Sequence, residues 1–184
     1  MKHKKKILFF ALSTPLLLAL FALLAILFIP RGYDKLRERP GTVEIPAALK
    51  ESVIKGTESM TAEEISSYCS DITCDLLSFS FKQDVLFENE VSRAHCVTYA
   101  RLHSSLCNIA FKAHDIDAEA VPIVCHMHVC GLNINTIIVS MLPQEYRRFF
   151  IDHDMVEIRK KSDKRVILAT DPAEHDLSGF ERNY

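Results

Sequence analysis

The sequence lacks a strong excess of charge of either sign. Its 22 Lys and Arg residues nearly balance its 24 Asp and Glu residues, and the 184-residue chain has a formal net charge of -2. We therefore expect neither a basic surface for nucleic acid nor an acidic, disordered chain. The sequence also has no internal repeat and no low-complexity tract. The roughly 150 residues outside its apolar N-terminal stretch suffice for one domain only.

An uncharged apolar segment occupies residues 7–29, after the basic residues 1–6. As a helix rising ~1.5 Å per residue it would span about 34 Å, enough to cross a bilayer. A cleaved signal peptide is the alternative, but the run is long and bulky residues occupy the place of a small-residue cleavage site. We predict a single-pass membrane anchor over 7–29. The domain after it is expected outside the cytoplasm, because a short N-terminal tail usually stays inside.

The rest of the chain predicts helices followed by an antiparallel sheet, an α+β fold. Residues 30–60 mix Pro, Gly and charge, which indicates a juxtamembrane tether with a short helix over 46–56, and we place the domain at 61–184. Helical spacing of apolar residues predicts helices over 62–77, opened by a Thr-x-x-Glu capping box, and over 95–112. Alternating residues predict strands over 78–81, 118–129, 132–142, 153–159 and 165–171.

Three residues suit nucleophilic catalysis by a thiol. Cys96 falls in the first turn of the second helix, where free N–H groups and the helix dipole stabilise a thiolate. His153 and Asp171 lie on or at the end of expected strands. An imidazole beside a thiolate forms an ion pair and later protonates the leaving group, while a carboxylate on its far nitrogen fixes the tautomer.

The segments around these residues resemble the transglutaminase-like domains of the papain-like superfamily. The positions that match the family's nucleophile helix and the turn after it are Cys96, Tyr99, Ala100, Leu102, Leu106, Ile116 and Ala118. HDMVEI at 153–158 resembles the family's histidine strand, and ATDPA at 169–173 resembles its Asp-Pro element. The resemblance covers 95–173. It implies that Cys96 is the nucleophile, that His153 is the base and that Asp171 orients the histidine, in a nucleophile helix packed on an antiparallel sheet.

The resemblance also implies a reaction class. An amide carbonyl of a protein or peptide substrate would be attacked, an amine would leave, and water or a second amine would resolve the thioester. We expect hydrolysis rather than cross-linking, because transfer needs a cleft that excludes water. No cofactor is required. The Cys96 N–H is the expected oxyanion donor, and Gln83 and Asn89 are candidates for the second donor.

Two positions depart from the family's pattern. Ala94 stands where many members have Gly, and Met155 stands where an aromatic residue usually flanks the histidine. They favour, as the alternative function, a catalytically inactive binding or scaffolding module that retains the fold.

Each of the three residues also has a plainer interpretation. Cys96 would be a buried small residue at a helix start. His153 would be a surface histidine between two aspartates, and Asp171 would only form a turn before proline.

A metal site is a further hypothesis for the CHMHVC segment at 125–130. In a strand, His126, His128 and Cys130 would point to one face. One straight strand cannot surround an ion, and the C-x2-C spacing of many zinc sites is absent. We prefer strand-face residues or a disulfide as the interpretation.

Overall fold

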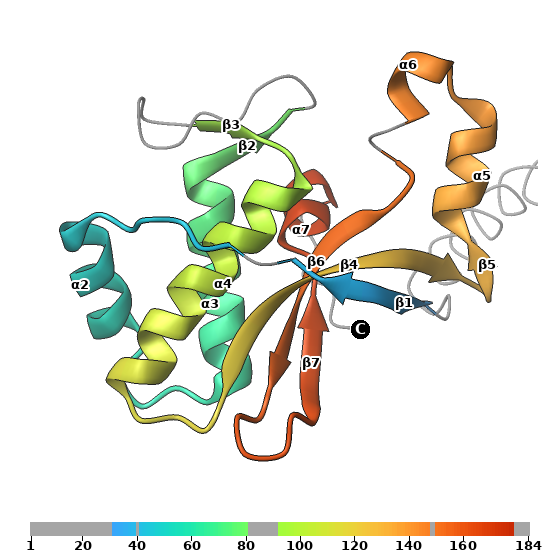
Figure 1. The fold of residues 1–184 in the computed structure, drawn as a ribbon. Helices are drawn as coiled ribbons and strands as arrows, with labels where there is room; N and C mark the ends of the chain where they lie inside the picture. The colour runs from blue at the N-terminus through green and yellow to red at the C-terminus, as the bar shows by residue number, and fades with distance from the viewer. Residues whose placement is uncertain (1–30, 40, 81–91, 148–149, 179–184) are drawn as a thin grey trace, which may run out of the picture.

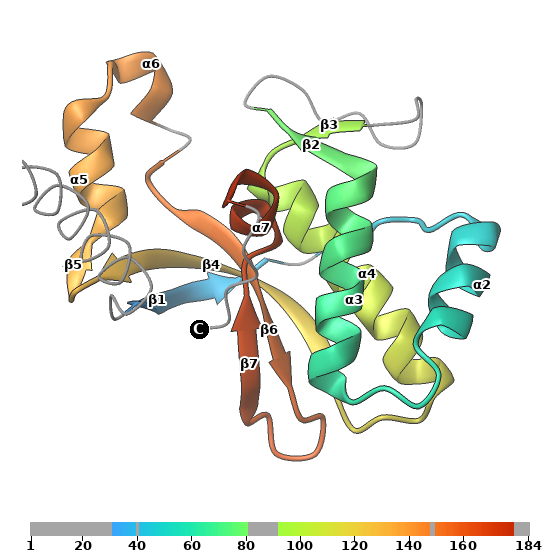
Figure 2. The same ribbon diagram turned by 180° about the vertical axis from the view of Figure 1, so that it is seen from behind.

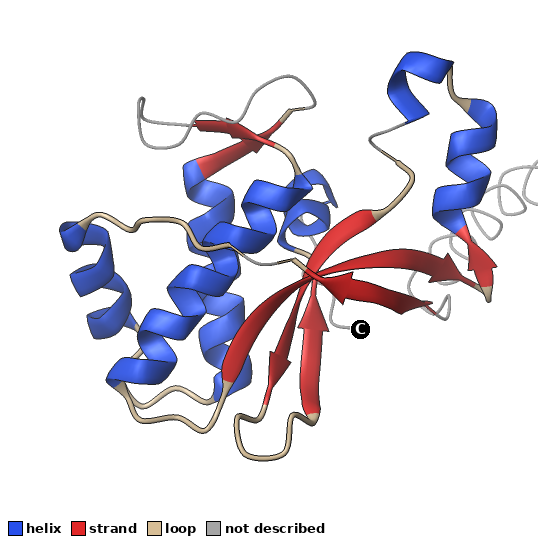
Figure 3. Ribbon diagram, viewed as in Figure 1, coloured by secondary structure: helices blue, strands red, loops and turns tan. Residues whose placement is uncertain are grey.

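The computed structural model describes residues 31–39, 41–80, 92–147 and 150–178 of the chain. In this part, helices pack against an antiparallel sheet, and the fold is α+β (Figure 3). The helices α2, α3 and α4 gather at one end of the sheet, and α5 and α6 stand at the other (Figures 1 and 2).

The main sheet has the strand order β1-β4-β6-β7, and every neighbouring pair is antiparallel. Its strands are β1 (Arg31–Glu38), β4 (Glu119–Val129), β6 (His153–Arg159) and β7 (Val166–Thr170). A short strand, β5 (Leu132–Asn133), pairs with the end of β4. The predicted strands over 118–129, 153–159 and 165–171 are therefore confirmed to within about a residue at each end.

The helix α4 (Cys96–Ala113) is the centre of the core. It packs against α3 (Ala62–Leu76) and α2 (Ala47–Gly56) on one side and against β4 and β6 on the other. Its inward side chains, each fully buried, are Tyr99, Leu102, Leu106, Ala110 and Phe111. Burial of each large apolar side chain contributes roughly 1.5–3 kcal/mol, so these residues fix the helix on the sheet. The helix predicted over 95–112 is confirmed.

The predicted capping box opens α3. The Thr61 Oγ1 accepts the Glu64 N–H at 3.2 Å, and the Glu64 carboxylate accepts the Thr61 N–H at 2.8 Å. These two bonds satisfy N–H groups that the first turn of a helix leaves without an internal acceptor. After α3 the chain enters β2 (Leu77–Phe79), which pairs in parallel with β3 (Ser92–Ala94) directly before α4.

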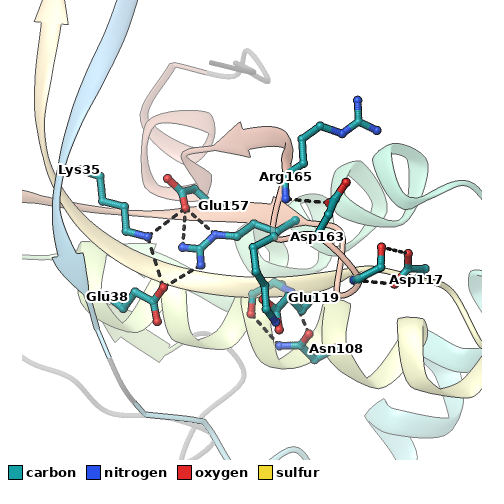
Figure 4. Close-up of polar contacts among 12 residues, drawn as sticks. Lys35, Glu38, Asn108, Asp117, Glu119, Glu157, Asp163 and Arg165 are labelled. Carbon is teal, nitrogen blue, oxygen red and sulfur yellow. Dashed lines mark hydrogen bonds and ion pairs between the residues drawn. The ribbon is translucent and has the colours of Figure 1, made fainter.

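The segment expected to be a tether contributes a strand to the sheet. Residues 31–38 form β1, with Arg31 opposite Val129 and Glu38 opposite Ile123 of β4. Polar contacts to β6 reinforce this pairing: the Lys35 Nζ lies 3.4 Å from Glu157 Oε2 (Figure 4). Charged side chains are common on edge strands, which is why the segment has the composition of a tether. The domain therefore begins before residue 61, and a strand precedes the helices.

The strand predicted over 132–142 is wrong beyond its first two residues. After β5 the chain forms the helices α5 (Ile134–Met141) and α6 (Gln144–Arg147). The Asn133 side chain caps α5 by accepting the Thr136 N–H at 3.0 Å. A short run of Ile and Val is compatible with either a strand or a helix. The Asn133 cap favours the helix.

The membrane helix included in the expected fold requires a correction. No helix in the described part of the chain has both the length and the apolar composition needed to cross a bilayer. Residues 7–29, where that helix was expected, lie outside the described residues. The observed fold is therefore α+β without a membrane-spanning helix among the elements described.

Candidate active site

Cys96, His153 and Asp171 come from three different elements that meet at the middle of the sheet. Cys96 is the first residue of α4, His153 is the first residue of β6, and Asp171 follows β7. Asp171 also begins the helix α7 (Pro172–Ser178). Its Oδ1 accepts the N–H groups of Ala173 at 3.1 Å and of Glu174 at 3.0 Å. An Asp cap followed by Pro in the first helical position is a favoured helix start, so the carboxylate is held in place.

The His153 imidazole is oriented by Asp171. The His153 Nε2 lies 2.6 Å from Asp171 Oδ2, and only 3 % of the Asp171 side chain is exposed. Burial of His153 disfavours its charged form, but Asp171 and Cys96 together outweigh burial and raise the imidazole pKa well above its usual value. Because Nε2 is engaged by the carboxylate, Nδ1 is the ring nitrogen left for the thiol.

The Cys96 thiol and the His153 imidazole line the same cavity and shift each other's pKa. Burial raises the Cys96 pKa, but hydrogen bonds with His153 and His95 outweigh it and lower the pKa to about 7. About half of the thiol is then ionised at neutral pH. His95 is the residue before α4 and lines the cavity described below.

A second carboxylate, from Asp154, lies beside the thiol. Asp154 Oδ2 is 3.9 Å from Cys96 Sγ, and 2 % of the Asp154 side chain is exposed. Arg39 forms a two-pronged ion pair with this carboxylate. Burial raises the Asp154 pKa, and Arg39 offsets only part of the rise. We did not predict either residue: Arg39 falls in the expected tether, and Asp154 is next to His153, where strand alternation places a side chain on the opposite face.

The three candidate residues line one cavity of about 440 Å³, which is in the usual size range of small-molecule sites. One side of the cavity is formed by the start of α4, the start of β6 and α7. The other side is formed by the end of β4 and by α5. The lining therefore includes α5, which stands at the opposite end of the sheet from α2 and α3 (Figure 1).

The candidate metal ligands do not converge. His128 lines the cavity, and its Nε2 lies 2.9 Å from Asp34 Oδ2. Cys130 is exposed in the two-residue turn after β4, with a positive φ of 51°. Across the ranges that the structure covers, no group of three His, Cys, Asp or Glu side chains, His126 included, is placed to hold a metal ion.

Cys74, Cys107 and Cys125 are chemically unlike Cys96. All six cysteines are free thiols, so none forms the disulfide considered from the sequence. Burial raises the pKa of Cys74 to about 12 and raises those of Cys107 and Cys125 well above the ordinary value. A lowered thiol pKa thus distinguishes Cys96 from Cys74, Cys107 and Cys125.

The arrangement is suited to nucleophilic attack by a thiolate on a carbonyl carbon. The Cys96 N–H belongs to a first helical turn, where N–H groups have no intrahelical acceptor. It is the candidate donor to a developing oxyanion, and the proposed second donors, Gln83 and Asn89, lie outside the described residues. No family model matches this chain, and no curated protein and no solved structure matches it.

Proposed function

We propose that this chain is a thiol-dependent acyl-transfer enzyme that acts on amide bonds of peptides or proteins. One relationship carries the proposal: the His153 imidazole binds Asp171 Oδ2 at 2.6 Å through Nε2, lines the same cavity as Cys96 and lowers the pKa of its thiol. A buried carboxylate, an imidazole and a thiol in this order form a catalytic relay of the kind that activates cysteine nucleophiles. The motif resemblance to transglutaminase-like domains supports the same assignment.

The reaction would begin from a thiolate on Cys96 and an imidazolium on His153. The sulfur attacks the amide carbonyl carbon, and the carbonyl oxygen becomes an oxyanion near the Cys96 N–H. When the intermediate collapses, the C–N bond breaks and His153 gives its proton to the departing amine. An acyl thioester remains on Cys96. His153, now neutral, takes a proton from water, whose oxygen attacks the thioester and releases a carboxylic acid and the thiolate.

Hydrolysis is the favoured outcome because water has access to the base. The His153 side chain is 22 % exposed, whereas Asp171 behind it is 3 % exposed. A water molecule can therefore approach the imidazole and the thioester from the cavity side. Cross-linking by a second amine would require that water be excluded.

The proposal is tested by alkylating the protein with iodoacetamide at pH 6 and quantifying each cysteine by mass spectrometry. An ordinary thiol of pKa about 8.5 is roughly 0.3 % ionised at this pH, and one of pKa about 7 is roughly 10 % ionised. A lower pKa also reduces intrinsic nucleophilicity, which leaves a net advantage of about six-fold. Exposed Cys130 is the reference thiol.

Two variants make the test specific. His153→Ala is expected to slow Cys96 labelling and to move its half-maximal pH upward, since it removes the hydrogen bond that lowers the thiol pKa. His128→Ala is the matched control, because His128 lines the same cavity but binds Asp34. Labelling of Cys96 at the rate of Cys130, unaffected by His153→Ala, would overturn the proposal and leave a non-catalytic binding module.

A further inference from the structure

Apolar side chains form part of the lining of the cavity that contains Cys96. These residues are Met127 and Val129 near the end of β4, Ile134 and Ile138 of α5, and Phe150 in the segment before β6. Ile134 and Ile138 are four residues apart and so project from the same face of the helix. We call these five residues the apolar wall.

The charged side chains that line the cavity have partners of opposite charge. The pairs are Arg31 with Glu174 at 2.7 Å, Asp152 with Arg37 at 3.5 Å, His153 with Asp171 at 2.6 Å, and Arg39 with Asp154. A charged group on a substrate would have to compete with these existing pairs and lose its own hydration. Because these charges are already paired, a charged substrate group is not expected to bind tightly to them. A substrate group that covers the apolar wall removes apolar surface from water, which is favourable.

The buried side-chain amide of Asn135 connects the segments that carry the apolar wall. Asn135, which is 7 % exposed, accepts the Met127 N–H through Oδ1 at 2.7 Å. Its Nδ2 donates to the Phe150 carbonyl oxygen at 3.1 Å. One side chain thus ties α5 both to β4 and to the segment that leads into His153. The wall is in this way fixed relative to the base.

We propose that the apolar wall binds an aliphatic or aromatic side chain on the acyl portion of the substrate, next to the carbonyl that Cys96 attacks. This inference rests on the proposed function and adds the substrate class. Ile138 is its specificity-determining residue, because it lies on the cavity face of α5. Its neighbour Ile137 is 37 % exposed and does not line the cavity.

The test uses three alkylating reagents that share one reactive group. Iodoacetamide has no side group, N-hexyl iodoacetamide has an apolar chain, and iodoacetamidohexanoic acid has a chain of similar length that ends in a carboxylate. The labelling rate of Cys96 is divided by that of Cys130 for each reagent, which removes differences in intrinsic reactivity. We expect this normalised labelling rate to be about ten-fold higher for the hexyl reagent than for the carboxylate reagent. That factor is the effect of burying roughly two methylene groups.

Substitutions at two neighbouring positions of α5 show where the hexyl chain binds. Ile138→Asp is expected to abolish the hexyl preference, and Ile137→Asp, which carries the same helix-propensity cost, should retain it. Ile138→Ala is the milder variant. We expect it to reduce the hexyl preference about three-fold, because the hexyl chain loses contact with roughly one methylene group. Circular dichroism of each variant shows whether α5 and the sheet remain folded.

The outcomes separate this inference from the proposed function. Rapid iodoacetamide labelling of Cys96 without any hexyl preference would overturn the apolar specificity alone. A hexyl preference that survives both Ile138 substitutions would also overturn it, since the chain would then bind elsewhere. Labelling of Cys96 no faster than Cys130 with plain iodoacetamide would overturn the proposed function instead.

Discussion

The Tyr99 Oη donates a hydrogen bond of 2.6 Å to Asp176 Oδ2, which ties α7 to the helix that begins with Cys96. The same carboxylate oxygen accepts the Phe79 N–H at 3.2 Å, so β2 is held at the same point. Tyr99 is fully buried, and burial together with this carboxylate raises its pKa. Because Asp171 begins α7, this contact helps to position the carboxylate that orients His153.

Tyr99→Phe should destabilise the fold. The substitution removes a hydrogen bond to a charged group, and the Asp176 oxygen keeps only the Phe79 N–H among the bonds described above. We expect the free energy of unfolding to fall by about 1.5–3 kcal/mol, measured by urea denaturation. Tyr146→Phe, at a tyrosine that is 49 % exposed, is the control and should change stability by less than about 0.5 kcal/mol. Equal effects of the two substitutions would contradict a structural role for the Tyr99 hydroxyl.

Asp171→Asn should separate the catalytic role of this residue from its structural role. Asn caps helices about as well as Asp, so α7 and the unfolding free energy should be nearly unchanged. The neutral amide can no longer stabilise a charged imidazole, so the His153 pKa should fall and the Cys96 labelling curve should move to higher pH. The measurement is the pH dependence of Cys96 alkylation. Asp171→Ala, which also loses the cap, should cost about 1 kcal/mol of stability in addition.

Asp154→Asn should shift the Cys96 labelling curve in the opposite direction. The Asp154 carboxylate lies 3.9 Å from the sulfur and raises the thiol pKa, so its removal should lower the half-maximal pH below about 7. Asp152→Asn is the control, because that side chain lines the same cavity but pairs with Arg37. An upward shift in Asp154→Asn would mean that this residue supports the thiolate rather than opposing it.

Cys74, Cys107 and Cys125 should resist alkylation at pH 8 while the protein is folded. Burial raises all three thiol pKa values, so the reactive thiolate is scarce, and Cys107 and Cys125 are also buried. In urea all three should label as ordinary thiols. Mass spectrometry of the native and the unfolded protein checks this, and rapid native labelling of Cys107, which is fully buried, would contradict the packing of α4.

Local pattern was sufficient to predict α3 and α4. The capping box at Thr61 and the apolar stripe through Tyr99 and Leu106 are encoded within one helix each, and neither depends on a distant partner. The same holds for the placement of Cys96 at a helix start. The position of the nucleophile in its helix could therefore be predicted from the sequence.

The tertiary structure decided what depends on contacts between distant segments. Residues 31–38 form a strand because they pair with the edge of β4. Arg39 binds Asp154, which is 115 positions away in the sequence. The Ile-rich run after Asn133 became α5 rather than a strand, and Asn135 then fixed it against β4. Composition cannot indicate such partners, because a charged edge strand resembles a tether and a short apolar run suits either element. The sequence alone determined which residues were candidates for chemistry, and only packing decided which side chains surround them.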